Sequence, residues 1–340
     1  MNRRMVFHTV GLIVLLEAVL LLIPTLVALL YRETSVTAFL ISIGIALLAG
    51  GILTFALPPK SRVIYAREGF AITSLAWLAL SAIGALPFYF SKQIPHYVDA
   101  FFETVSGFTT TGASILKNVE LLDHGLLFWR SFTHWVGGMG VLVFLMVFLP
   151  GLSDRSIHII RAEMPGPTVG KLMPRVRDTA GVLYIIYLVI TAAEILLLKL
   201  SGLSLFDSFL YSFGSVGTGG FGVYADSVAS MTAAQQWIIT VFMFLCGINF
   251  NLFYLILIRR FRSALRSSEL WVYVGVTVLS SLAVCANIAS LYPSFSEAIR
   301  HSAFQVVSIS TTTGFSTVDF NLWPAFSKTV LLILMFIPSR

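Results

Sequence analysis

Three similar segments, moderately apolar and rich in Thr, Ser and Gly, repeat along the chain, and each leads into a turn of threonine and glycine. They read DAFFETVSGFTTTGA, DSFLYSFGSVGTGGF and HSAFQVVSISTTTGF, at residues 99–113, 207–221 and 301–315. The segments align without gaps, so that Gly112, Gly220 and Gly314 share one column. Glycine permits backbone angles that turn successive carbonyl oxygens to one side, and hard cations prefer oxygen ligands. The chemistry predicted is coordination of a dehydrated cation by backbone carbonyl groups.

The composition indicates the class of protein that positions these segments. Of the 340 residues, 57% are hydrophobic and 11% are charged, whereas a soluble domain carries about 25% charged residues. The mean hydropathy is +0.89. Cys246 and Cys285 lie inside apolar runs and form neither a disulfide framework nor a metal-binding spacing. We therefore expect an all-α polytopic membrane protein.

Seven stretches reach the length of about 20 apolar residues that a helix needs to cross a bilayer. They are residues 9–30, 36–57, 69–90, 126–149, 180–200, 237–258 and 270–291. The first exceeds the apolar core of a cleaved signal peptide, so we expect it to be retained. An eighth element, 325–337, would be about 20 Å long as a helix, which is too short for a hydrocarbon core of about 30 Å. We therefore expect a truncated or incomplete product.

The basic residues predict the orientation. If the spans alternate, 14 of the 22 lysines and arginines fall on one side and seven, including Arg130, on the other. The side rich in lysine and arginine is cytoplasmic, so the N-terminus is expected there. Topology thus accounts for the net charge of +6, and nucleic-acid binding has no support.

Each Thr/Gly segment lies between two predicted spans, which gives a repeated unit of span, short helix, filter loop and span. Such repeats around an axis are typical of membrane transport proteins. Irregular backbone at membrane depth is tolerated where it lines a cavity or is buried in protein. Three segments in register are not expected of ordinary extracellular loops. The predicted domains are two leading helices (1–66), a first repeat with a basic loop (67–177), a second repeat (178–268) and an incomplete third repeat (269–340).

Several further motifs occur in a recognisable order. The pore segments contain SGFTTTGAS, VGTGGFG and STTTGFST, and the chain also carries REGF (67–70), GALPF (84–88), WVGGMG (135–140) and RAEMPGP (161–167). With these motifs the whole chain resembles the Trk/Ktr/HKT superfamily of potassium transporters, and in particular its bacterial TrkH-type members.

The resemblance implies four repeats arranged pseudo-symmetrically around a pore, preceded by two extra helices. It implies potassium uptake across the bacterial inner membrane, with potassium as the transported ion and no covalent cofactor. It also implies a homodimer and a cytoplasmic nucleotide-binding regulatory subunit of the TrkA type. The basic loop 151–178 is a candidate docking surface for that subunit.

The family's ion-coordinating positions carry over to nine residues of this chain. Glycine in the three key columns resembles potassium-selective members, whereas serine in the first column is associated with sodium-permeable plant relatives. The implied potassium ligands are Thr110, Thr111, Gly112, Thr218, Gly219, Gly220, Thr312, Thr313 and Gly314.

The sequence departs from the family pattern after the third filter. It contains neither a fourth repeat nor the glycine-rich gating loop of the span that follows, so we expect poor conduction or none by these residues alone. The alternatives are a symporter driven by protons or sodium and a non-conducting truncated product. An enzyme is not expected, because the polar residues concentrate in Thr/Gly loops rather than in paired carboxylates or a nucleophile with its base.

Other polar residues allow two interpretations. Asp99 and Asp207 open the first two short segments and favour a helix N-terminus. Glu103 either attracts cations or forms a hydrogen bond behind the filter. Glu17 and Glu194 lie within spans, where a carboxylate is a functional candidate, but a packing role is at least as well supported. His134 and His301 have no neighbouring ligand set of the kind that zinc requires.

Overall fold

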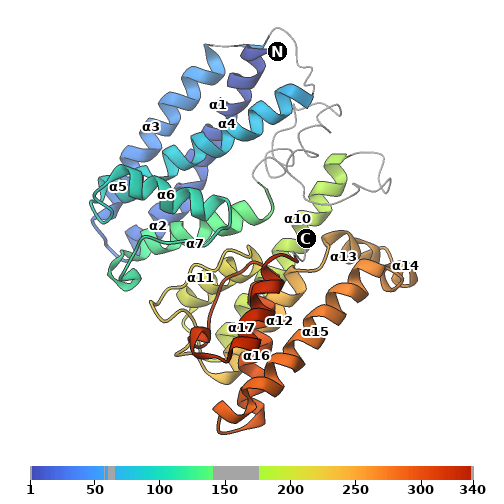
Figure 1. Cartoon of the computed structure of the whole chain (residues 1–340). Coiled ribbons are helices and arrows are strands. Elements are labelled where there is room, and N and C mark those ends of the chain that lie inside the picture. Colours follow the sequence, from blue (N-terminus) through green and yellow to red (C-terminus); the bar gives the residue numbers. More distant parts are fainter. Residues whose placement is uncertain (1, 57, 60–65, 141–175, 338–340) are drawn as a thin grey trace. The chain divides into compact units, whose positions relative to one another are not determined.

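A computed structural model describes residues 2–56, 58–59, 66–140 and 176–337. Every regular element in these ranges is a helix (Figure 1), and their one β-bridge joins Tyr224 to Ser227. The described chain forms two compact units. The first contains residues up to 109 and from 113 to 184, and the second contains residues 110–112 and those from 185 onward. The motif at 161–167 and the predicted span beyond residue 140 lie outside the described residues.

The first unit contains the elements of the leading helices and of the first predicted repeat. They are α1 (Arg3–Leu20), α2 (Leu22–Leu30), α3 (Ser35–Phe55), α4 (Ala66–Gly84), α5 (Leu86–Phe90), α6 (Tyr97–Phe108) and α7 (His124–Gly138). Small residues let α1 and α3 approach closely: a Cβ added to Gly50 would lie 3.0 Å from the carbonyl oxygen of Gly11. Such contacts are typical of helix pairs in lipid, where no hydrophobic effect drives association.

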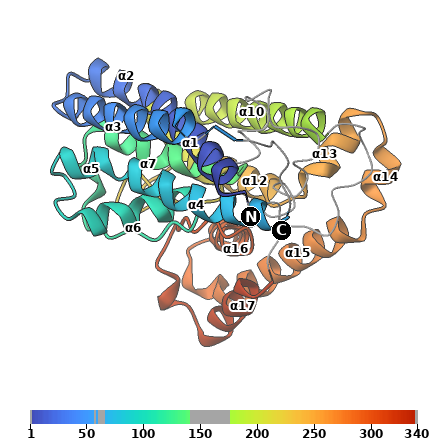
Figure 2. The same ribbon diagram turned by 90° about the horizontal axis from the view of Figure 1, so that it is seen from above.

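The second unit contains two further short helices and the spans around them. α10 (Val176–Leu200), which belongs to this unit from residue 185 onward, leads into α11 (Leu205–Val216), α12 (Ala233–Cys246), α13 (Phe250–Leu257) and α14 (Phe261–Leu265). The chain continues through α15 (Ser268–Ile288), α16 (Phe295–Ser310) and α17 (Ala325–Met335). α15, α16 and α17 pack together in both views (Figures 1 and 2). Their shared core includes Ile288, Val306 and Leu331.

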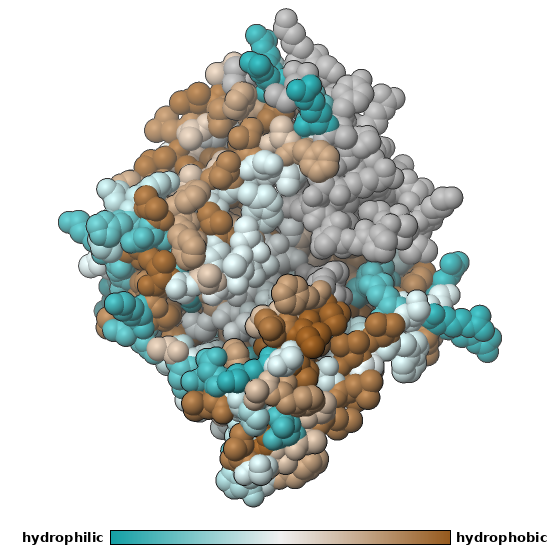
Figure 3. All heavy atoms as spheres, viewed as in Figure 1, coloured by the Kyte–Doolittle hydropathy of each residue, from teal (hydrophilic) through white to brown (hydrophobic). Residues whose placement is uncertain are grey.

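The described helices are suited to a bilayer by length and composition. Within the described ranges, five helices could span a membrane, or six if one bent pair counts as a single span. Large hydrophobic side chains stay exposed on α3 and α15, including Leu48 and Leu279. Hydrophobic residues form several patches on the face seen in Figure 3. Apolar surface of this extent indicates contact with lipid, and the expected polytopic all-α class is confirmed.

The stretch predicted as a span at 237–258 is broken into two helices. α12 and α13 are bent by 87° at the break between them. Asn249 starts the second helix, because its side chain accepts a hydrogen bond from the backbone N–H of Asn251. Gly247 lies at the break, where an added Cβ would be 2.5 Å from the Tyr273 hydroxyl oxygen and 2.7 Å from Thr311 Cγ2. Hydropathy detects the apolar stretch but not this change of direction.

The starts of the short helices also differ from the sequence prediction. α16 begins at Phe295, where the Ser294 side chain accepts from the Glu297 N–H, so His301 lies in its second turn. In α11 the N-cap is Ser204, and Asp207 lies in the first turn with its N–H donating to the serine. Asp99 lies in the first turn of α6. The two aspartates therefore have the position that favours the helix dipole, although neither is the cap.

Candidate functional site

The three short helices end in the same unusual backbone turn. Two residues after each helix a threonine adopts a positive φ, with values of 54°, 54° and 58° at Thr110, Thr218 and Thr312. This left-handed region is uncommon for any residue with a side chain and unfavourable for a β-branched one. The glycines of the shared column follow, with φ of 75°, 74° and 90° at Gly112, Gly220 and Gly314. The aligned columns of the sequence therefore share one backbone geometry.

Backbone hydrogen bonds fix how the loop leaves the helix. The N–H groups of Gly219 and Gly220 donate to the Gly214 carbonyl oxygen at 2.9 and 3.3 Å. Thr313 and Gly314 donate to the Ser308 carbonyl oxygen at the same two distances. These bonds satisfy a carbonyl of the last helical turn that has no partner inside the helix. The second and third loops thus leave their helices in matching directions.

The three loops meet within the second unit. A Cβ added to Gly112 would overlap the Gly219 carbonyl oxygen and would lie 3.9 Å from that of Thr313. A Cβ added to Gly220 would likewise overlap the Thr313 carbonyl oxygen. Each glycine therefore faces the carbonyl that precedes the glycine of the next loop. The arrangement brings backbone oxygens from different loops together.

Gly314 differs from the other two glycines of its column. No atom of the described residues lies within 4 Å of the Cβ position built on it. The first loop thus contacts the second, and the second contacts the third. No described residue makes the matching contact with the third loop at Gly314.

The nine predicted ligands differ in exposure. Thr218, Gly219 and Thr313 are buried, Thr110, Gly112 and Gly220 are half-buried, and Thr111, Thr312 and Gly314 are exposed. The third loop is braced by hydroxyl groups: Thr311 Oγ1 and Thr313 Oγ1 are 2.8 Å apart, and Ser308 Oγ donates to the Phe315 carbonyl oxygen at 2.7 Å. The structure thus brings the three segments together, and their binding of potassium stays a prediction.

Glu103 forms an ion pair behind the first loop. Arg130 Nε lies 2.6 Å from Glu103 Oε1, and both side chains are buried. These contacts agree with the second interpretation of Glu103, in which its carboxylate forms a hydrogen bond behind the filter. Arg130 was wrongly counted as a charge outside the membrane, because its guanidinium is buried and paired. Without it, six basic residues oppose 14, so the charge bias that predicts the orientation becomes stronger.

Two buried carboxyl groups lie beside the short helices. Glu194 on α10 accepts a hydrogen bond of 2.6 Å from Ser215 Oγ, three residues before Thr218. In the first unit Glu17 lies beside Gly84, on which a Cβ would be 2.9 Å from both Glu17 Oε1 and Thr104 Cγ2. Glu17 and Glu194 are far from the Thr/Gly loops in the sequence, so the sequence did not predict that they lie beside the short helices. Both contacts agree with packing roles against α6 and α11.

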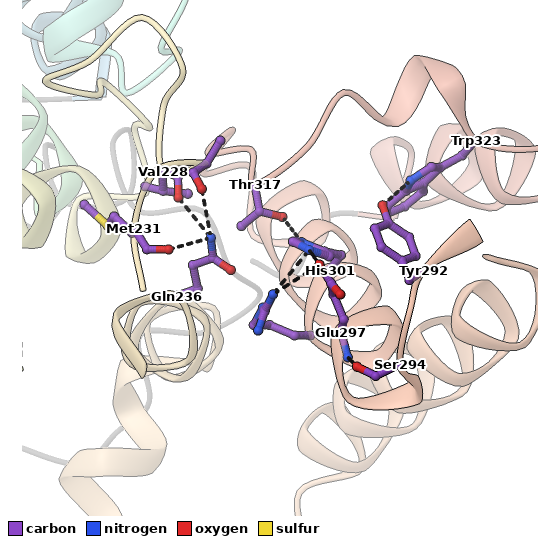
Figure 4. A network of polar contacts seen from close by, with 11 residues as sticks. Val228, Met231, Gln236, Tyr292, Ser294, Glu297, His301, Thr317 and Trp323 are labelled. Atoms are coloured by element: carbon purple, nitrogen blue, oxygen red, sulfur yellow. Dashed lines mark hydrogen bonds and ion pairs between the residues drawn. The ribbon is translucent and has the colours of Figure 1, made fainter. Parts of the chain in front are cut away.

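Polar side chains hold the chain that follows the second and third loops (Figure 4). Gln236 Nε2 donates to the carbonyl oxygens of Val228 and Met231 at 3.1 and 3.2 Å. His301 Nδ1 lies 2.8 Å from Thr317 Oγ1. His301 is thus engaged in a structural contact. No group of three or more His, Cys, Asp or Glu side chains within the described ranges is placed to hold a metal ion.

Known proteins are similar to this chain in sequence and fold. The TrkH family, described as cation transport proteins, matches residues 35–274. The Trk system potassium uptake protein TrkH of Salmonella typhimurium is 36% identical over 345 aligned residues, which cover 99% of this chain and 71% of the relative. The protein of the same name from Escherichia coli K12 matches at the same identity and coverage. The crystal structure of the potassium transporter TrkH from Vibrio parahaemolyticus superimposes with a TM-score of 0.84 at 32% identity, covering 98% of this chain and 70% of that one.

Proposed function

The chain belongs to the TrkH family of cation transport proteins, and from this premise we propose that it takes up potassium through a filter of backbone carbonyls. The observation that carries the proposal is the position of the Gly219 and Thr313 carbonyl oxygens against the glycines of neighbouring loops. Oxygen atoms gathered in this way can replace the hydration shell of an ion. The transported ion is potassium because the relatives named above are potassium uptake proteins.

Each loop contributes its Thr-Gly columns to the filter. The carbonyl before the shared glycine coordinates the ion, and the glycine leaves room for the neighbouring loop. The C-terminal ends of α6, α11 and α16 precede the loops, and the negative end of a helix dipole favours a cation. A complete ring needs about four such walls. The open side at Gly314 is where a fourth loop would contribute its carbonyl.

The expected setting is the bacterial inner membrane, with the N-terminus in the cytoplasm. The distribution of lysine and arginine supports this orientation. The expected assembly is a homodimer that binds a cytoplasmic nucleotide-binding subunit of the TrkA type, since the named relatives are components of a Trk system. The repeat boundaries proposed are 67–177, 178–268 and 269–340, after two leading helices at 1–66.

Uptake of ⁸⁶Rb⁺ by cells that lack their own potassium uptake systems tests the proposal. We expect weak uptake, because the described loops form three of about four walls, but uptake above that of the empty vector, with external K⁺ competing much better than Na⁺. Uptake no higher than in the control, from protein that reaches the membrane, would refute potassium conduction by this chain.

Coupled transport is the second candidate mechanism, and no feature described above favours it over a continuous pore. Current reversal in planar bilayers distinguishes the two. A pore reverses at the potassium equilibrium potential, whereas coupling to H⁺ or Na⁺ shifts the reversal when the gradient of the coupling ion is changed.

A further inference from the structure

The buried pair of Glu103 and Arg130 connects three segments of the first repeat. Glu103 lies on α6 at 1% exposure, and Arg130 lies on α7 at 3%. Glu103 Oε1 accepts from Arg130 Nε at 2.6 Å and from Ser114 Oγ at 2.8 Å. Glu103 Oε2 accepts from the Ile115 backbone N–H at 3.1 Å. One carboxylate thus ties the short helix and the second helix to the chain that leaves the first filter loop.

The negative charge of Glu103 is neutralised by its partners. Its three partners all donate hydrogen bonds, and a guanidinium neutralises the carboxylate at hydrogen-bond distance. A carboxylate engaged in this way attracts an ion in the pore weakly. Its geometric effect is larger, because Ser114 and Ile115 follow Gly112 by only two and three residues. Holding them restrains the direction in which the Thr111 and Gly112 carbonyls point.

The other two repeats make a related link without a charge. The residues aligned with Glu103 are Tyr211 and Gln305. The Tyr211 hydroxyl donates to the Ser227 carbonyl oxygen at 2.7 Å, in the chain that follows the second loop. Gln305 Oε1 is buried without a hydrogen-bond partner among the described residues. In the third repeat the contact comes from one turn earlier, between His301 and Thr317. Among the described residues, each short helix therefore contacts the chain beyond its own loop, and in the first repeat the contact comes from a carboxylate that is also paired with an arginine.

We infer that Glu103 and Arg130 are positioning residues that set the ion selectivity of the filter by fixing the exit of the first loop. This inference rests on the proposed potassium pathway. It predicts that weakening the pair lets the first loop relax, so that the carbonyls no longer discriminate between K⁺ and Na⁺. The pair itself does not contact the ion.

The substitution Glu103→Gln tests this role with little change of shape. A glutamine amide has one acceptor oxygen, and its NH₂ group would face one of the three donors. Glu33→Gln is the matched control. Glu33 also accepts three hydrogen bonds, from the His124 N–H and ring Nδ1 and from the Gly125 N–H. These lie at the start of α7 and include no residue of the filter loop.

Two readouts are measured on purified protein reconstituted in liposomes. The first is the ratio of ⁸⁶Rb⁺ to ²²Na⁺ flux, and the second is hydrogen–deuterium exchange at the Ile115 amide. We expect Glu103→Gln to lower the flux ratio at least about fivefold, equivalent to roughly 1 kcal/mol, and to accelerate exchange. Glu33→Gln should leave both unchanged. Parental values of either readout in Glu103→Gln would overturn the inference.

Two further cases also test the inference: a Glu103→Gln protein that does not fold, and a parent protein that does not conduct. If Glu103→Gln does not fold, Ser114→Ala replaces it, because that change removes one bond to the carboxylate and leaves the ion pair intact. We expect a smaller shift of both readouts in the same direction, and no shift of either would overturn the inference. If the parent protein conducts no ⁸⁶Rb⁺, the proposed function fails. The Ile115 exchange of the two variants then still shows whether the carboxylate holds the loop.

Discussion

The carbonyl oxygen of Thr313 occupies the space in which a side chain on Gly220 would have to begin. Two separate constraints thus require glycine at this position. The φ of 74° is unfavourable for any residue with a side chain, and the neighbouring Thr313 carbonyl leaves no room for a Cβ. Gly112 repeats both constraints, with the Gly219 carbonyl as its neighbour. The loops therefore interlock through their backbones, and a change in one loop displaces the carbonyl of the next.

Gly220→Ala should reduce ⁸⁶Rb⁺ uptake at least about tenfold, a barrier increase of roughly 1.4 kcal/mol. The added methyl group must displace the Thr313 carbonyl, which we propose as an ion ligand. Gly275→Ala is the control, because its Cβ position has no neighbour within 4 Å among the described residues. Undiminished uptake by Gly220→Ala at equal membrane levels would show that the Thr313 carbonyl is not a ligand.

Gly112→Ser and Gly112→Ala should both lower the preference for Rb⁺ over Na⁺. The overlap with the Gly219 carbonyl oxygen begins at Cβ, so the serine hydroxyl is not required for the effect. The ratio of ⁸⁶Rb⁺ to ²²Na⁺ uptake measures it. A selective Gly112→Ala protein beside a non-selective Gly112→Ser protein would instead assign the effect to the hydroxyl group.

Gly137→Ala should destabilise the first unit. This glycine belongs to the WVGGMG motif, and a Cβ on it would overlap the Phe108 carbonyl oxygen at the end of α6. Overpacking of this kind costs about 1–3 kcal/mol, which we expect to observe as a lower unfolding temperature in detergent. Gly51→Ala, whose Cβ position is free of described neighbours within 4 Å, should leave the unfolding temperature unchanged. Equal unfolding temperatures for the two variants would argue against close packing of α7 on α6.

Gly247→Ala should destabilise the break between α12 and α13, and Tyr273→Phe should recover part of the loss. The added Cβ would be 2.5 Å from the Tyr273 hydroxyl oxygen, which donates to the Phe244 carbonyl oxygen at 3.0 Å. Removing that hydroxyl costs about 1 kcal/mol alone but relieves the clash in the double variant. Thermal unfolding of the four proteins gives the coupling energy. Strictly additive effects would exclude the contact.

Local patterns predicted much of this fold. The column of Gly112, Gly220 and Gly314 was visible because glycine tolerates a positive φ far better than residues with a side chain. The apolar stretches identified the spans because burial in lipid depends on composition and length. Where a residue's role depends on backbone geometry or hydropathy, that role can therefore be predicted from the sequence alone.

Contacts between residues far apart in the sequence could not be predicted from these local patterns. Counting charges treats each arginine as solvated, so the pairing of Arg130 with Glu103 was missed. Glu194 is distant in sequence from the second loop, and only the packing of α10 brings it to Ser215. Two local signals were present but not used. Ser294 followed by Glu297 marks the start of α16, and Gly247 with Asn249 marks the break in the predicted span.

Anomalous diffraction from crystals soaked in Rb⁺ tests the carbonyl filter most directly. We predict a peak among the loops of the second unit, in direct contact with the carbonyl oxygens of Gly219 and Thr313 and lost in Gly220→Ala. Ordered loops with no Rb⁺ at these oxygens, in crystals whose ions bind elsewhere, would contradict the central claim.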